Sequence, residues 1–86
     1  MKEIRFSSHA QLKMEVLASH GVTIDSSFVM ETVRSPDKLE TGDENKLIAQ
    51  KSLDTNSVLR VVYREFNAFI LIITLYPGRR SRYEKN

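Results

Sequence analysis

The feature that most constrains the fold of this chain is an apolar run at residues 68–76, with the sequence AFILIITLY. In an extended chain this run is apolar on both faces, so a strand made from it needs cover on both sides. The run is far too short to span a bilayer as a helix. Pro77 and Gly78 follow directly and are expected to end the strand. The sequence therefore predicts an interior strand of a sheet.

A second strand is expected at residues 58–64, because β-branched and aromatic residues dominate this segment. Residues 65–67, between the two strands, are expected to form a hairpin loop, since they include an asparagine, which tolerates positive φ. Alternation places Arg60 and Arg64 on one face of the strand at 58–64. The opposite face is apolar and comprises Leu59, Val61 and Tyr63. One face thus belongs to the core, and the other face is left for a separate role.

The N-terminal half predicts a short strand followed by a helix. Apolar and charged residues alternate at residues 3–6, which is typical of a half-buried strand. Ser7 or Ser8 can cap a helix over residues 9–19 by accepting a backbone N–H. Gly21 is expected to end this helix in the left-handed conformation.

A second helix and a further strand complete the predicted elements. The second helix begins after Asp25 or Ser26 and ends at the residue before Pro36, which disfavours helical angles. Residues 46–53 alternate weakly and predict another strand between two turns. The sequence thus predicts a single α+β domain over residues 1–86. In this domain two N-terminal helices pack on one face of a mostly antiparallel sheet of about four strands.

Basic residues gather at the C-terminal end of the sequence. Residues 79–86 carry a net charge of +3, while residues 1–78 carry −1. Arginines on one surface can bind phosphate through two parallel hydrogen bonds. Taken alone, the tail also fits a solvated terminus, and Arg60 fits a strand arginine whose head pairs with a glutamate. Both interpretations stay open on this evidence.

Several other classes of site are not expected. The chain has no cysteine, and His9 and His20 lack an acidic partner at metal-ligand spacing, so neither a metal nor a cofactor is predicted. There is no Gly-rich phosphate loop and no nucleophile elbow. No apolar run follows Met1, so we expect a cytoplasmic protein without a signal peptide or membrane segment.

The order of motifs resembles a family of short bacterial domains of unknown function near the RelE/ParE-like toxins, which include BrnT. The helix segment SSHAQLKMEVLASHGVT carries a His-Ala pair, then a basic residue and a methionine, then Gly-Val. A Pro-Asp pair, an RVVY strand and an IITLYP strand follow in the same order. The resemblance covers nearly the whole chain and implies a RelE-like domain.

The segment LRVVYREFNAFILIITLYPGRRSRY is similar to the strand, hairpin, strand and basic tail of RelE-type ribonucleases. This resemblance implies Arg60, Arg80 and Lys51 as catalytic residues. Arg82 matches a further basic residue of this pattern. We expect RNA to be bound by Arg64, Arg79, Arg82 and Tyr83, because residues 79–86 are basic and Arg64 shares the face of Arg60. Two positions depart from the pattern, because a second strand lysine falls on Leu53 and Tyr83 lies too early for the C-terminal catalytic tyrosine. ParE-type relatives keep the fold and do not cut RNA.

The resemblance implies a toxin-like component of a toxin–antitoxin system, acting as a metal-independent mRNA endoribonuclease. In this chemistry the ribose 2′-OH attacks the adjacent phosphate, and fixed arginines stabilise the charge that develops. The expected partners are RNA, including mRNA on the ribosome, and an antitoxin protein. A core of this size also leaves room for a homo-oligomer. The alternatives are a non-catalytic RelE/ParE-like protein-interaction domain and a small nucleic-acid-binding domain.

Overall fold

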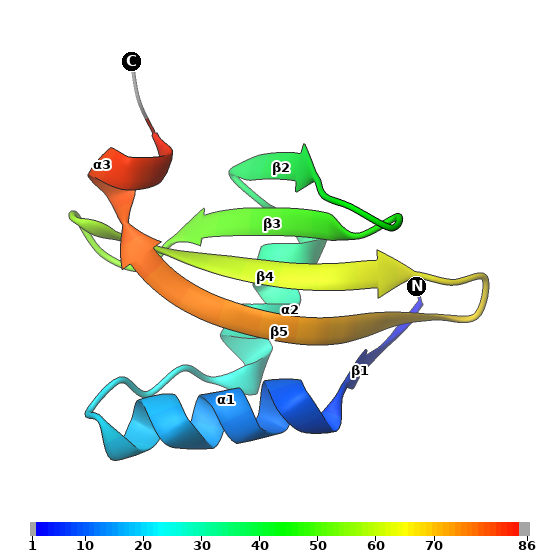
Figure 1. Cartoon of the computed structure of the whole chain (residues 1–86), viewed down its shortest axis with the longest axis horizontal. Helices are drawn as coiled ribbons and strands as arrows, with labels where there is room; N and C mark the ends of the chain where they lie inside the picture. Colours follow the sequence, from blue (N-terminus) through cyan, green and yellow to red (C-terminus); the bar gives the residue numbers. More distant parts are fainter. Residues whose placement is uncertain (1, 85–86) are drawn as a thin grey trace.

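A five-stranded mixed sheet forms the centre of the structure, a computed structural model that describes residues 2–84 (Figure 1). The strands are β1 (Glu3–Phe6), β2 (Lys38–Thr41), β3 (Leu47–Ser52), β4 (Ser57–Glu65) and β5 (Phe69–Arg79). The helices are α1 (Ser8–Ser19), α2 (Ser26–Arg34) and α3 (Arg80–Tyr83). The strand order is β1-β5-β4-β3-β2, in which β1 runs parallel to β5 and every other pair is antiparallel.

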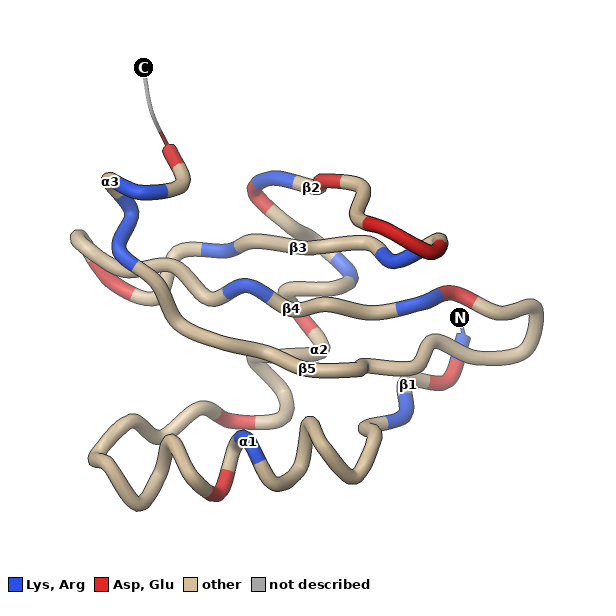
Figure 2. The backbone as a smooth tube through the Cα atoms, viewed as in Figure 1, with Lys and Arg blue, Asp and Glu red and all other residues tan. Residues whose placement is uncertain are grey.

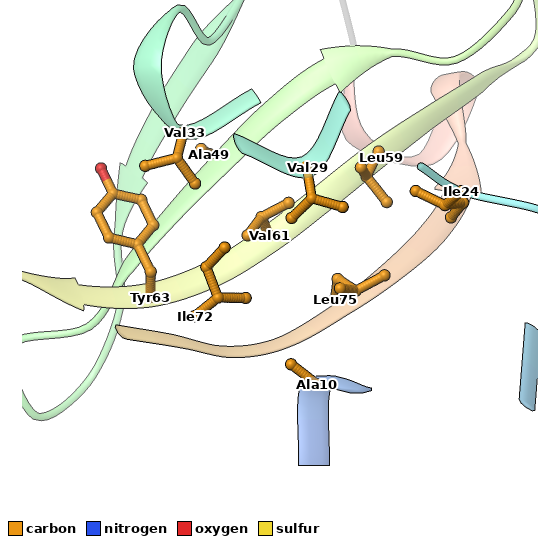
Figure 3. Packing of buried hydrophobic residues seen from close by; sticks show 10 residues of the cluster. All are labelled: Ala10, Ile24, Val29, Val33, Ala49, Leu59, Val61, Tyr63, Ile72 and Leu75. Atoms are coloured by element: carbon orange, nitrogen blue, oxygen red, sulfur yellow. The ribbon is translucent and has the colours of Figure 1, made fainter. Parts of the chain in front are cut away.

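The hydrophobic core lies between one face of this sheet and the helices α1 and α2 (Figure 3). Alternate residues of β4 and β5 point toward the helices, as the pattern of residues 58–64 predicted. The buried core residues are Ala10, Ile24, Val29, Val33, Ala49, Leu59, Val61, Tyr63, Ile72 and Leu75. Since only one face is covered by α1 and α2, the other face of the sheet is open to a different use.

The predicted helix boundaries are confirmed. The Ser7 hydroxyl accepts a hydrogen bond from the Ala10 N–H at 3.0 Å, which caps α1. The same hydroxyl donates to the Ile73 carbonyl at 2.8 Å and so fastens the start of α1 to β5. Gly21 has φ +86° after the end of α1. Ser35 follows α2 directly before Pro36, as expected.

The interior position predicted for residues 68–76 is also confirmed, because β5 lies between β1 and β4. The expected cover on both faces is not found among residues 2–84, since α1 and α2 pack on one face only. The expected end at Pro77 is wrong, since β5 continues to Arg79 and Pro77 pairs with Leu59. A proline is tolerated there because β1 pairs β5 only as far as Ile72, so the later part of β5 has a free edge.

The sheet contains five strands where about four were expected. It is mostly antiparallel, as predicted, but the pairing of β1 with β5 is parallel, so the sheet is mixed. The additional strand is β2, whose sequence KLET has a single apolar residue, Leu39, and that residue is exposed at the sheet edge. The positive φ angles also occur elsewhere than expected. Glu44 and Asn45, between β2 and β3, adopt them, and Asn67 in the β4–β5 hairpin does not. In residues 2–84, no helix is long and apolar enough to cross a membrane.

Candidate functional site

The sheet face opposite α1 and α2 carries a row of polar side chains. The strand register aligns Lys38 of β2 with Gln50 of β3, Gln50 with Arg60 of β4, and Arg60 with Tyr76 of β5. Residues in register project to the same face of a sheet. We call this surface the open face, and it consists of Lys38, Gln50, Arg60 and Tyr76 together with their neighbours on the same side.

Arg60 lies at the centre of the open face and is buried there, with only 5% of its side chain exposed. Its Nη1 donates to Gln50 Oε1 at 2.6 Å and to Glu40 Oε2 at 3.0 Å, and its Nε donates to the Tyr76 hydroxyl at 3.0 Å. The Tyr83 ring stacks on the guanidinium at 4.1 Å. The pairing with a glutamate matches one of the two interpretations of Arg60, although the side chain is buried rather than partly exposed.

The contacts around Arg60 and Glu40 favour the charged form of both side chains. Burial by itself lowers the pKa of Arg60, but the hydrogen bonds with Glu40 and Tyr76 outweigh burial, and the net pKa is raised. The hydrogen bond from Arg60 holds the pKa of Glu40 below its ordinary value of 4.5, against the opposing effect of desolvation. The pair therefore stays ionised at neutral pH.

Arg80, the first residue of α3, connects this helix to the end of β3 and the loop between β3 and β4. Its Nε donates to the Thr55 carbonyl at 3.0 Å, and its Nη2 donates to Ser52 Oγ at 2.7 Å and to the Asp54 carbonyl at 2.9 Å. Its Nη1 donates to Glu84 Oε1 at 2.8 Å. The interpretation of the tail as a solvated terminus is therefore wrong through residue 84, because Arg80 binds it to the sheet. Lys85 lies outside the described residues.

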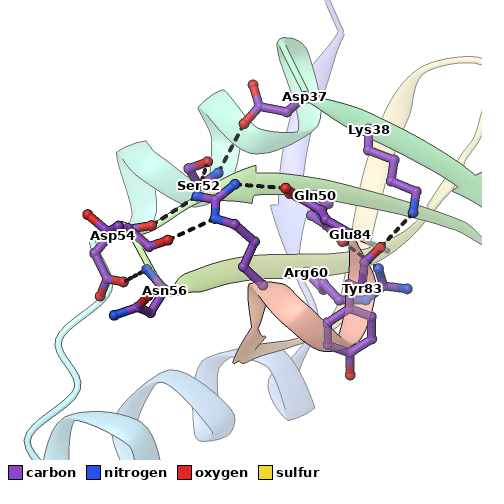
Figure 4. A network of polar contacts seen from close by, with 11 residues as sticks. Asp37, Lys38, Gln50, Ser52, Asp54, Asn56, Arg60, Tyr83 and Glu84 are labelled. Carbon is purple, nitrogen blue, oxygen red and sulfur yellow. Dashed lines mark hydrogen bonds and ion pairs between the residues drawn. The ribbon is translucent and has the colours of Figure 1, made fainter. Parts of the chain in front are cut away.

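A carboxylate and an amide join the two arginines that were predicted to be catalytic. Glu84 Oε2 accepts from Gln50 Nε2 at 2.9 Å, and the other end of the Gln50 amide accepts from Arg60. The connection therefore runs from Arg80 through Glu84 and Gln50 to Arg60 (Figure 4). The structure thus places Arg60 and Arg80 in one hydrogen-bonded network.

Lys51 does not join this network. It is in register with Leu59, a core residue, so it lies on the face that α1 and α2 cover. Its Nζ donates to the Ser35 carbonyl at 2.9 Å and lies 3.9 Å from Asp37 Oδ1. Lys51 was expected to be catalytic together with Arg60, but the two side chains lie on opposite faces of the sheet, because Gln50 rather than Lys51 shares the orientation of Arg60.

The arginines predicted to bind RNA differ from Arg60 and Arg80 in having no carboxylate partner among the described residues. Within residues 2–84, Arg64, Arg79 and Arg82 form no ion pair. Arg64 lies over the Phe66 ring at 5.9 Å, and Arg82 lies 5.8 Å from the Tyr83 ring. The backbone trace shows basic residues clustered where β5 meets α3 (Figure 2). Arg64 lies near the other end of the sheet, next to the last residue of β4.

A groove of about 620 Å³ opens beside Arg80. Its walls are the loop between β3 and β4 and the junction of β5 with α3. The lining residues are Thr55, Asn56, Ser57, Arg79, Arg80, Ser81 and Glu84. The groove is therefore lined by hydroxyl, amide and charged groups, of a kind that suits an anionic ligand.

Sequence reasoning missed the roles of Gln50, Glu84 and Glu40. Alternation alone could place Gln50 opposite Lys51, but only the register with β4 shows which of the two shares the face of Arg60. Glu84 was counted only as an opposing charge in the tail. Among residues 2–84, no group of three or more His, Asp or Glu side chains could hold a metal ion.

These features define an α+β domain with two helices on one sheet face and an arginine network on the other. No family model matches the chain, and no curated protein matches it. A solved structure that it resembles is the solution structure of the conserved hypothetical protein HP0894 from Helicobacter pylori. The two chains are 16% identical, and the match covers 94% of this chain and 97% of that one with a TM-score of 0.53. At this level of identity the likeness establishes the fold alone.

Proposed function

We propose that this chain is a toxin-like component of a toxin–antitoxin system that binds RNA across the open face. The observation that carries the proposal is the division among its arginines. Arg60 and Arg80 are engaged with carboxylates, while Arg64, Arg79 and Arg82 form no ion pair within residues 2–84. Unpaired arginines at a surface are available for phosphate, and they contribute a salt-dependent affinity for nucleic acid.

The positions of these arginines fit an extended strand of nucleic acid. Arg79 ends β5 and Arg82 lies within α3. Arg64 lies six residues along β4 from Val58, which pairs with Gly78 at the α3 end of the sheet. At the usual rise of a strand this separation is about 20 Å. A ligand that contacts both ends must therefore carry several phosphates. The resemblance of residues 59–83 to RelE-type ribonucleases makes RNA the expected polyanion.

RNA cleavage is the finer part of the proposal. Arg60 and Arg80 are the candidates for stabilising a phosphate that gains charge in the transition state. Two candidates for the general base are poorly placed. Lys51 faces the helices, and Tyr63 is a core residue whose pKa is raised mainly by burial and also by the charge of Glu65. Tyr76 is a further tyrosine of this surface, and its hydroxyl accepts a hydrogen bond from Arg60. Cleavage would thus use a general base other than Lys51.

A second function is favoured by the same network. Because Arg60 and Arg80 are already paired with Glu40 and Glu84, they can hold the open face together without any ligand. A non-catalytic RelE/ParE-like domain that binds a partner protein needs no more than this. The two functions differ in whether the unpaired arginines contact RNA.

RNA binding can be tested with a triple variant in which Arg64, Arg79 and Arg82 are replaced by Ala. We expect the affinity for a short single-stranded RNA, measured by fluorescence anisotropy, to fall at low salt. The slope of log affinity against log salt should decrease by about 0.7 for each lost phosphate contact, or by about 2 for all three.

The control is a double variant in which Lys13 and Arg34 are replaced by Ala. These two cations lie on α1 and α2 and also form no ion pair within residues 2–84. This control removes positive charge from the helix-bearing side of the molecule and should leave the salt slope close to that of the wild type. Equal affinities of the triple variant and the wild type at every salt concentration would rule out RNA binding by the open face.

A further inference from the structure

The carboxylate of Glu84 has an arrangement that resembles a bound anion. One oxygen accepts from Arg80 Nη1 at 2.8 Å, and the other accepts from Gln50 Nε2 at 2.9 Å (Figure 4). Gln50 is only 1% exposed, and its amide oxygen is held by the guanidinium of Arg60. Gln50 therefore presents its N–H groups in a fixed direction, toward the position that the carboxylate occupies.

We propose that this position is a phosphate-binding site, that Glu84 is its internal occupant, and that a phosphodiester group of RNA competes with Glu84 for it. A phosphate, like a carboxylate, offers anionic oxygens to a guanidinium and to a neighbouring N–H. The donors are Arg80 and Gln50, and Arg60 lies behind Gln50 as a second positive charge. The inference rests on the proposed function only in taking RNA as the source of the phosphate.

The groove beside Arg80 gives a ligand access to this position. Glu84 and Arg80 both line the groove, so a ligand in the groove lies beside two of the three residues that define the anion position. Arg79 also lines the groove and forms no ion pair within residues 2–84. A phosphate that enters the groove therefore meets one unpaired guanidinium beside the one that Glu84 occupies.

Glu84 is the carboxylate that can be exchanged, in contrast to Glu40. The side chains of Arg80 and Glu84 are 31% and 33% exposed, and ion pairs at this level of exposure contribute little to stability. Glu40 instead pairs with Arg60, whose side chain is almost fully buried. Displacing Glu84 requires only the movement of a residue that follows a single helical turn, whereas displacing Glu40 would leave a buried charge without a partner.

The test uses inorganic phosphate as the probe and two variants of the full chain, Glu84→Gln and Glu84→Ala. Backbone amide shifts of Gln50, Ser52 and Arg80 are followed by NMR during a phosphate titration at constant ionic strength. We expect both variants to bind phosphate roughly three to ten times more tightly than the wild type, because the internal competitor is lost. The control is Glu15→Gln, which makes the same change in net charge on the exposed side of α1.

The results separate this inference from the proposed function. If Glu84→Gln and Glu15→Gln bind phosphate equally well, or if the shifts avoid Gln50 and Ser52, the site does not exist. The same variants are then titrated with single-stranded RNA. If the Glu84 variants bind RNA with the same affinity as the wild type, the inference is wrong and the proposed function is unaffected. Phosphate binding at Gln50 without any RNA binding keeps the anion site and overturns RNA as its ligand.

Discussion

Arg60 keeps a positive charge although its side chain is almost completely removed from water. A buried charge persists only where opposite charge and hydrogen bonds replace its hydration. Glu40 provides the charge, Gln50 and Tyr76 provide neutral acceptors, and Tyr83 covers the guanidinium. Within residues 2–84, no buried side-chain nitrogen or oxygen lacks a hydrogen-bond partner. Arg60 therefore organises the open face through contacts within the protein.

The variant Glu40→Gln should change the pH dependence of stability. The pKa of Glu40 lies below its ordinary value of 4.5, chiefly because Arg60 donates a hydrogen bond to its carboxylate. A carboxyl whose folded-state pKa is lowered stabilises the protein fully above its unfolded pKa, and this contribution is lost as the pH falls through the folded-state pKa. We therefore expect the free energy of unfolding of the wild type to decline more steeply below pH 4.5 than that of the variant.

Urea unfolding at a series of pH values measures this difference, with Glu15→Gln as the control for removing one carboxylate elsewhere. Parallel curves for the wild type and Glu40→Gln across the acid range would show that the pair with Arg60 does not stabilise the fold.

Single residues differ in how far the sequence determines their surroundings. Alternation in residues 58–64 predicted the face of Arg60, and its pairing with a glutamate was one of two interpretations. The position of Lys51 could not be obtained in the same way. Alternation within β3 assigns Gln50 and Lys51 to opposite faces, but the sequence does not give the register that aligns Gln50 with Arg60. A shift of one residue would have exchanged their roles.

At the scale of elements, α3 depends on the sheet for its existence. It has four residues, and a helix of that length has no stability of its own. The Tyr83 ring lies against Gly78 of β5, where an added Cβ would overlap the ring. The Tyr83 carbonyl also accepts from Lys38 Nζ of β2 at 2.9 Å. The glycine after Pro77 therefore allows α3 to lie on the open face instead of ending the strand.

Replacing Gly78 with Ala should weaken the packing of α3 on the sheet. The added methyl group collides with a surface ring, which can move away, so we expect the free energy of unfolding to change by only about 1 kcal/mol. Movement of Tyr83 would uncover the arginine-rich segment at residues 79–82. Limited trypsin digestion should therefore remove the tail of Gly78→Ala several times faster than that of the wild type, because cleavage follows the population of the open form.

Gly42→Ala is the matched control, because a Cβ at Gly42 meets its nearest atom at an ordinary distance of 3.6 Å. A tail that resists trypsin equally in Gly78→Ala and Gly42→Ala would show that the contact between Gly78 and Tyr83 does not hold α3.

Elements with strong local signals could be predicted, and those held by tertiary contacts could not. The caps of α1 and the alternation of β4 are local features, and both were anticipated within about one residue. The segment β2 lacks an apolar pattern and becomes a strand because it pairs with β3. In the same way, α3 forms because Arg80 and Tyr83 contact the sheet. Both β2 and α3 are therefore stabilised by contacts with residues distant in the sequence.

For the whole molecule, the two sheet faces have different compositions and different roles. The apolar face is covered by α1 and α2, and its pattern was sufficient to predict an α+β domain. The open face contains charged groups whose partners come from β2, β3, β5 and the residues after α3. Such long-range pairings carry no local signature, so the sequence indicated the arginines of the site without their carboxylate partners.

Expression of the protein without an antitoxin tests the proposed activity of the molecule as a whole. If the open face binds and cleaves RNA, the wild type should inhibit growth and translated mRNA should be cut. Arg60→Ala and Arg80→Ala should each lower cleavage by about a hundredfold or more, because each removes a group that stabilises charge on the phosphate. Arg5→Ala and Arg34→Ala should leave cleavage unchanged. These two variants remove the same charge away from the network.

The contacts of Arg60 and Arg80 make thermal unfolding a necessary companion measurement, since Arg60→Ala leaves Glu40 without its partner. Loss of cleavage is informative for a variant that remains folded at the growth temperature, and Arg80, with its partly exposed side chain, is the better placed of the two. If the wild type is harmless and leaves mRNA intact, cleavage is excluded. If the wild type also fails to bind RNA, the open face is a structural surface of a protein-interaction domain, and the second proposed function takes the place of the first.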